Sequence, residues 1–213
     1  MRSIILELHQ LANSQKRFSF SFHQSLIEIP KNGIYFIFEK GERYKDLDRI
    51  VRVGTHTGHN QLSPRLYQHF IMENKNRSIF RKNIGRCFLN KDNNSYLNLW
   101  ELDITSRVNK NENLKRVDIV FEKQIESRIS EYFRTNLSFC VFQIDSKSDR
   151  LFWESKIASS LAKAPDTIPS ANWLGNYSPK DKIKQSGLWQ VNGLSEDILT
   201  ESEFEQLKEI ITL

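Results

Sequence analysis

Three short segments of the chain carry residue types that suit chemistry on a phosphodiester bond. Gly33-Ile34-Tyr35 opens a predicted strand, Arg52-Val53-Gly54 closes a second one, and a helix that follows carries Arg65 and His69. Residues four apart lie on one face of a helix, so the guanidinium and the imidazole point the same way. This order gathers a phenol, a guanidinium and an imidazole at one end of a small sheet.

Arg65 is the strongest catalytic candidate. Cleavage of a phosphodiester builds negative charge on a five-coordinate phosphorus, and a planar guanidinium meets that charge with two hydrogen bonds. His69 titrates near neutral pH, so it suits orienting the attacking water or relaying its proton. A purely structural histidine is the alternative interpretation of His69.

Tyr35 is a catalytic candidate only if a positive charge lies near its hydroxyl. A free phenol has a pKa of about 10 and is a poor base at neutral pH, so a neighbouring cation has to stabilise the phenolate. Arg52, Arg65 or His69 can supply that positive charge. The alternative is a strand tyrosine that packs its ring.

Together these segments resemble the core of a GIY-YIG nuclease domain, from Asn32 to Phe70, and Phe152-Trp153-Glu154-Ser155-Lys156 resembles the acidic helix of that family. The resemblance implies that Tyr35 deprotonates or positions the attacking water. One departure is plain, because the second motif of the family has a tyrosine where this chain has Arg52. The role of that tyrosine therefore has no counterpart here.

The resemblance also implies a metal site. Glu154 would hold one divalent cation, Mg²⁺ or Mn²⁺, that stabilises the departing 3′ oxygen, and a hard oxygen ligand with several retained waters is what Mg²⁺ prefers. A lone glutamate on a helix is otherwise usually just solvated. The family often has an asparagine downstream of its glutamate, and Asn172 is the candidate for it. Arg52 or His56 is the candidate replacement for the missing tyrosine.

Basic residues are concentrated in one stretch of a chain whose net charge is +5. Between positions 65 and 90 the only acidic residue is Glu73, against the basic residues Arg65, Lys75, Arg77, Arg81, Lys82 and Arg86. A phosphate backbone attracts such a patch by releasing its counterions. We therefore interpret Arg81, Lys82 and Arg86 as DNA contacts, with a solvated helix face as the alternative.

The apolar pattern predicts an α+β fold, with a small three-stranded antiparallel sheet flanked by helices and with helical N- and C-terminal additions. Strands are predicted over 33–40, 49–55 and 137–144, with a polar connection between the first two. Helices are predicted over 3–14, from 63 onward, and over 78–88, 117–134, 148–161 and 201–211, and loops over 91–95 and 109–113. We expect a helical addition over 1–30, a nuclease-like core over 31–164 and a packed C-terminal extension over 165–213.

Composition narrows the class of protein. A content of 38% hydrophobic and 27% charged residues is typical of a globular protein. It has no apolar run of 18 residues and no signal-peptide pattern at its N-terminus, so we expect a cytoplasmic protein that does not contact a membrane. Cys87 and Cys140 fit no metal or redox spacing and are expected to be buried thiols.

The leading prediction is a metal-dependent DNA endonuclease of the restriction or repair type, which would suit a homodimer if it cuts both strands. The alternative is a DNA-binding module that has lost or weakened its nuclease activity, which the arginine at position 52 favours. A structural protein without nucleic acid would require Arg65, His69 and Glu154 to be coincidental.

Overall fold

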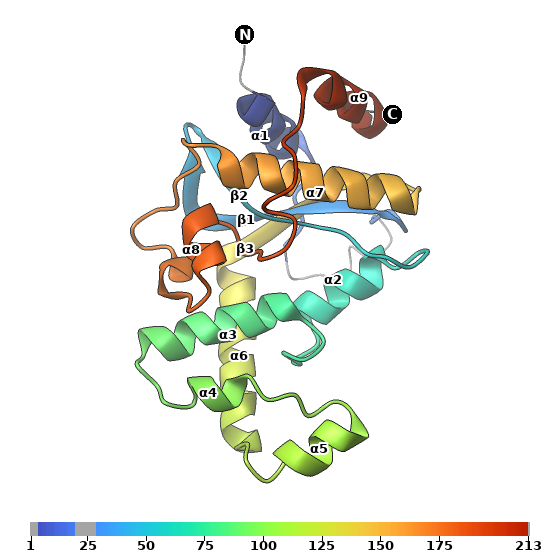
Figure 1. Ribbon diagram of the computed structural model, residues 1–213. Coiled ribbons are helices and arrows are strands. Elements are labelled where there is room, and N and C mark those ends of the chain that lie inside the picture. Colours follow the sequence, from blue (N-terminus) through green and yellow to red (C-terminus); the bar gives the residue numbers. More distant parts are fainter. Residues whose placement is uncertain (1–3, 20–28, 213) are drawn as a thin grey trace.

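The computed structural model describes residues 4–19 and 29–212 as a small sheet between two layers of helices (Figure 1). The strands are β1 (Gly33–Tyr44), β2 (Leu47–Gly54) and β3 (Leu137–Gln143). All pairings are antiparallel, in the order β2-β1-β3. The predicted α+β class is confirmed, while residues 20–28 of the predicted N-terminal addition lie outside the described residues.

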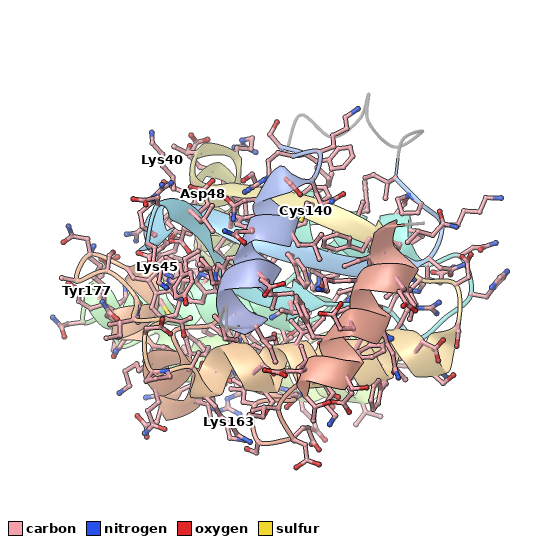
Figure 2. All side chains as sticks on the ribbon, turned by 90° about the horizontal axis from the view of Figure 1, so that it is seen from above. Lys40, Lys45, Asp48, Cys140, Lys163 and Tyr177 are labelled. Atoms are coloured by element: carbon pink, nitrogen blue, oxygen red, sulfur yellow. The ribbon has the colours of Figure 1, made fainter. Side chains whose placement is uncertain are left out.

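Helices cover both faces of the sheet. They are α1 (Ile4–Ser14), α2 (Leu62–Phe70), α3 (Ile79–Lys91), α4 (Leu97–Trp100), α5 (Arg107–Asn113), α6 (Ile119–Asn136), α7 (Lys147–Lys163), the 3₁₀ helix η2 (Leu174–Tyr177), α8 (Asp181–Ser186) and α9 (Glu201–Thr212). Helices α1, α7 and α9 pack on one face, which Figure 2 shows from above, and α2, α3 and α6 lie on the other.

The alternation of side chains along β1 creates two separate cores. Ile34, Phe36 and Phe38 join the core under α1, α7 and α9, whereas Tyr35 and Ile37 join the core under α2, α3 and α6. All five are almost fully buried, as expected for a central strand covered on both faces. The period of two thus sends the tyrosine to the face that carries α2.

The connection between the first two strands differs from the prediction. The polar residues from Gly41 onward continue β1 to Tyr44, and the chain reverses at Lys45, whose φ of 53° lies in the left-handed region. An ion pair of 2.6 Å between Arg43 and Asp48 crosses the hairpin. One face of the segment, with Gly41 and Arg43, is exposed, whereas Glu42 and Tyr44 on the other face are buried, so its polar character marks a half-exposed strand and not a loop.

Two helix assignments also differ. Residues 109–113 were predicted to be a loop but belong to α5, because the Ser106 hydroxyl caps its first turn by accepting the Asn109 N–H at 3.0 Å. Helix α2 begins at Leu62, so Ser63 lies inside its first turn and does not cap it.

The C-terminal segment seals the open edge of β2. The Trp189 N–H donates to the Val51 carbonyl at 2.7 Å, and the Gln190 amide oxygen accepts the Val53 N–H at 3.3 Å. An edge strand otherwise presents unpaired backbone groups to solvent. This contact brings residues that are far away in the sequence next to the motif at the end of β2.

Glu39 anchors that segment from beneath the sheet. Its buried carboxylate accepts the indole N–H groups of Trp173 at 3.0 Å and of Trp189 at 2.7 Å, and also the hydroxyl of Tyr132 on α6. Burial raises the pKa of Glu39, and the three donated hydrogen bonds act in the opposite direction.

We expect Glu39→Ala to lower the free energy of unfolding by at least about 3 kcal/mol, because each buried donor left without a partner costs roughly 1–3 kcal/mol. Glu39→Gln should cost much less, since the amide oxygen still accepts from the indoles and the tyrosine hydroxyl can turn to accept an amide N–H. Urea unfolding of both variants measures the difference. An equal loss of unfolding free energy in the two variants would show that the hydrogen bonds accepted by Glu39 do not hold the C-terminal segment in place.

Candidate active site

A chain of hydrogen bonds joins β1, α2 and the start of α3. The Tyr35 hydroxyl lies 3.0 Å from His69 Nε2, and His69 Nδ1 lies 2.6 Å from Ser78 Oγ. Ser78 also caps α3 by accepting the Arg81 N–H at 3.2 Å. Neither Tyr35 nor His69 has exposed surface, so the phenol that was expected to face a cleft is covered in this structure.

The glycines of the two motifs make room around this chain. Gly54 pairs with Tyr35 across the strands, and a Cβ at Gly54 would lie 2.3 Å from the Tyr35 ring and hydroxyl. A Cβ at Gly33 would lie 2.2 Å from the Phe142 carbonyl oxygen of β3. Any larger residue at either position would displace the tyrosine ring or the strand that supports it.

His69 is neutral in this environment. Burial is the main cause that lowers the pKa of His69 well below 6.5, and the positive charges of Arg65, Arg52 and Arg81 act in the same direction. In a neutral imidazole one nitrogen donates and the other accepts. When Nδ1–H donates to Ser78, Nε2 is the acceptor for the Tyr35 hydroxyl proton.

Arg65 lies on the wall of a polar pocket of about 500 Å³ at the end of β2, lined by Thr55, His56, Thr57, Gly58, Gln61, Arg65 and Gln68. Its guanidinium donates to the Gln68 side chain at 3.2 Å and to the Arg77 carbonyl at 3.5 Å. It forms no ion pair with any residue in the described part of the chain. An unneutralised guanidinium on such a wall suits an anionic ligand.

His56 shapes this pocket with both ring nitrogens engaged. Its Nε2 accepts the Gly33 N–H at 3.3 Å, so Nδ1 donates to the Gly58 carbonyl at 2.8 Å. Burial lowers the pKa of His56, which keeps the ring neutral. His56 therefore ties the loop after β2 to the start of β1 and has no free nitrogen to replace the hydroxyl of a tyrosine.

Arg52 occupies the place of the second tyrosine and faces the same core as Tyr35. It lies opposite Ile37 in the sheet, donates through Nη1 to the Trp189 carbonyl, and lies over the Phe80 ring at 5.0 Å. Its Nε is buried and has no hydrogen-bond partner among the described residues. The Nε–H group of Arg52 is therefore available to donate a hydrogen bond to a ligand inside the site.

Glu154 lies on α7 beside the sealed edge of β2. Its carboxylate accepts the Gln190 amide N–H at 3.3 Å and forms no ion pair with a described residue. Burial raises the pKa of Glu154, and the charge of Arg52 acts in the opposite direction. Glu154 and Arg65 share no contact among the hydrogen bonds and ion pairs of the described residues.

The donor set near Glu154 fits a weakly held hard cation. In the described part of the chain no three His, Cys, Asp or Glu side chains group into a metal site. Mg²⁺ needs no such group, because it often takes one or two carboxylates and completes its shell with waters and substrate phosphates. One half-buried carboxylate without an ion-pair partner satisfies that requirement.

Gln190, which the sequence analysis did not select, holds Glu154 from the side. Its amide bridges the carboxylate to β2, whereas Asn172 is exposed and makes no side-chain hydrogen bond within the described residues. The available signal was the apolar run from Leu188 to Val191, which a single polar amide, Gln190, interrupts. Only the pairing of that run with β2 brings the amide to the site.

The predicted DNA contacts on α3 are engaged within the protein. Arg81 is fully buried and pairs with Glu126 of α6 at 2.6 Å, while Arg86 pairs with Glu101 at 2.6 Å and Lys82 lies 3.5 Å from the same carboxylate. These cations join α3 to α6 and to the residue after α4. Their placement runs against the expectation that they contact DNA, because helices cover the face they occupy.

Comparison with known families matches residues 3–212 to a family model described as a GIY-YIG domain. The match spans nearly the whole chain, so the protein belongs to the GIY-YIG family, whose members are generally nucleases. Neither the comparison with curated proteins nor that with solved structures gives a match. None of the helices in the described residues has the length and apolar character needed to cross a membrane.

We expect His69 to make the protein less stable in acid. Its folded pKa lies below 6.5, so the unfolded chain binds the proton more readily, and stability falls as the pH drops from about 6.5 toward the folded value. His69→Gln should flatten the dependence of unfolding free energy on pH by about 1.4 kcal/mol per pH unit, the effect of one proton.

His9, whose pKa burial lowers to about 4, gives a matched comparison outside the site, and His9→Gln should flatten the curve in the same sense. Carboxyl groups with raised pKa values, such as Glu39, act in the opposite sense but equally in all variants. Denaturant titrations at several pH values measure each slope. An unchanged slope in His69→Gln would mean that folding does not lower the pKa of His69.

Proposed function

We propose that the protein is a metal-dependent DNA endonuclease that hydrolyses phosphodiester bonds. The observation that carries the proposal is the unneutralised guanidinium of Arg65 on a polar pocket, one helical turn from the buried His69–Tyr35 pair. Membership of a nuclease family supports the same reaction class.

In this proposal the scissile phosphate enters the pocket at the end of β2. Arg65 donates two hydrogen bonds to the phosphoryl oxygens, whose charge grows in the transition state. Its present acceptors, an amide and a carbonyl, are neutral, so the phosphodiester monoanion competes with them effectively. Arg52 Nε supplies a further donor on the same side of the sheet.

Proton transfer is assigned to Tyr35 and His69. Neutral His69 accepts the phenolic proton at Nε2, while Tyr35 takes a proton from the attacking water, which leaves a hydroxide equivalent for the phosphorus. Ser78 holds the ring in the required tautomer by accepting from Nδ1. The step needs one water at the Tyr35 hydroxyl, so DNA binding has to open the packing around Gly54.

Glu154 would hold the divalent cation, with Gln190 fixing the orientation of the carboxylate. When bound there, Mg²⁺ supplies charge stabilisation at the departing 3′ oxygen. The carboxylate must be ionised for this role, and the positive charge of Arg52 favours ionisation against the effect of burial.

A second candidate function is a DNA-binding module without cleavage. It is favoured by the complete burial of Tyr35 and His69 and by the arginine at position 52. Incubation with supercoiled plasmid in Mg²⁺ and in EDTA separates the two. Nicking or linearisation only in Mg²⁺ supports the endonuclease, a salt-sensitive gel shift without cleavage supports the binding module, and the absence of both contradicts each.

We expect Arg65→Ala to reduce cleavage at least about a hundredfold, the usual loss when one transition-state donor is removed. The matched control is Arg134→Ala, since Arg134 is an exposed helix arginine on α6 that pairs with Glu131 at the surface. Single-turnover plasmid cleavage gives the rate, and circular dichroism checks the fold. Near-normal cleavage by Arg65→Ala would remove the main support for the mechanism.

Arg52→Gln should move the acidic limb of the pH–rate profile to higher pH. Glu154 already has a raised pKa, and loss of the nearby positive charge raises it further, so the carboxylate protonates earlier as the pH falls. Arg52→Lys keeps the charge and should leave the limb closer to that of the wild type. Circular dichroism at each pH distinguishes titration of Glu154 from unfolding of the protein. If the wild type and both variants have the same acidic limb in the pH–rate profile, Arg52 lies outside the site.

A further inference from the structure

A group of exposed cations lies on a helical arm, defined here as residues 104–123, which holds α5 and the start of α6. Its exposed basic residues are Arg107, Lys110, Lys115, Arg116 and Lys123. None of them forms an ion pair within the part of the chain that the structure describes. The exposed acids of the arm are Glu112 and Asp118, and Asp118 is occupied as the cap of α6.

The basic stretch on and before α3 has the opposite character. Arg81 and Arg86 are buried in ion pairs, and Lys75 pairs with Glu122 at 2.7 Å while donating to the Trp100 carbonyl at 2.8 Å. A cation held in this way reaches a phosphate only by giving up its partner. Counterion release on DNA binding therefore has to come from unpaired cations, and the arm supplies them.

Arg77 links the pocket at Arg65 to a groove beside the arm. The Arg65 guanidinium donates to the carbonyl of Arg77, and the side chain of Arg77 lines a second pocket, of about 730 Å³, together with Lys123 and Thr105. This groove runs between the loop before α3 and the arm. In Figure 1 the arm projects below α3, at the end of the molecule away from α1 and α9.

The acids in the groove are mostly neutralised. Glu122 pairs with Lys75 and Glu126 with Arg81, which leaves Glu73 as the groove acid without an ion pair among the described residues. Arg77 and Lys123 line the same groove, so the single negative charge of Glu73 does not cancel the positive charge there.

We propose that the arm over residues 104–123 contacts the phosphate backbone of the duplex DNA that flanks the scissile phosphate. The proposal rests on the proposed function, because it takes the Arg65 pocket as the place of cleavage. Unpaired arginines and lysines on a projecting element match a polyanion, and Arg77, whose carbonyl accepts from Arg65, lines the groove beside the arm. Contacts of this kind position the duplex without reading its sequence.

The test compares two triple variants that remove the same number of lysine charges. The arm variant replaces Lys110, Lys115 and Lys123 by glutamine. The control variant replaces Lys40, Lys45 and Lys163, which are exposed on the hairpin and at the end of α7 (Figure 2). Binding of a fluorescent duplex is measured by anisotropy in EDTA, so that no cleavage occurs, across about 50–200 mM salt.

We expect the slope of log affinity against log salt to shrink by about 2–3 in the arm variant, since each lost phosphate contact removes roughly 0.9. The control variant should keep the wild-type slope. Equal slopes in the arm variant and the wild type would overturn the proposal while leaving the proposed function intact, whereas a wild type that binds no DNA would overturn both.

Two further outcomes would also overturn it. Arm-dependent binding of duplex RNA but not of duplex DNA of the same sequence would assign the arm to a different nucleic acid. The arm substitutions could also convert a dimer to a monomer, as measured by light scattering, while DNA binding stays unchanged. That result would show that the arm is a contact between two copies of the chain.

Discussion

The unpaired edge of β2 is the constraint on which the rest of the site depends. A three-stranded sheet has two edges, and this one carries the motif that ends at Gly54. Residues 187–190 satisfy the edge through the backbone of Trp189 and the side chain of Gln190. The strand that carries the site is therefore completed by the last quarter of the chain, a segment that the family match includes.

Sealing this edge makes an arginine tolerable where the family has a tyrosine. A buried guanidinium without partners would cost several kcal/mol, because charged donors lose their hydration on burial. The Trp189 carbonyl accepts from Arg52, and the Phe80 ring lies beneath it. Burial lowers the pKa of His69 and raises the pKa of Glu154, and the charge of Arg52 adds to the first effect and opposes the second. A neutral tyrosine at this position exerts no such effect.

The sequence predicted the features that depend on neighbours along the chain. The run of strand-forming residues placed Tyr35 at the start of the first strand, and a spacing of four put Arg65 and His69 on one side of a helix. It did not predict which of the polar residues find partners across the fold. Arg81 and Lys75 read as free cations because Glu126 and Glu122 are more than forty positions away. Gln190 was missed for the same reason, since its contact with Glu154 exists only after the C-terminal segment pairs with β2.

The net charge illustrates this limit. The excess of +5 equals the excess within positions 65–90, which made α3 the natural choice for a DNA surface. Folding pairs most of those cations with carboxylates of α6 and of the residue after α4, so the charge that they contribute to the surface is small. The acids used in these pairs are Glu122 of the arm itself and Glu101 and Glu126 on either side of it, and the exposed cations of the arm are consequently left without partners among the described residues. The position of positive charge on the protein surface thus depends on which acidic residues form ion pairs inside the tertiary structure. Counting charges along the sequence does not give that position.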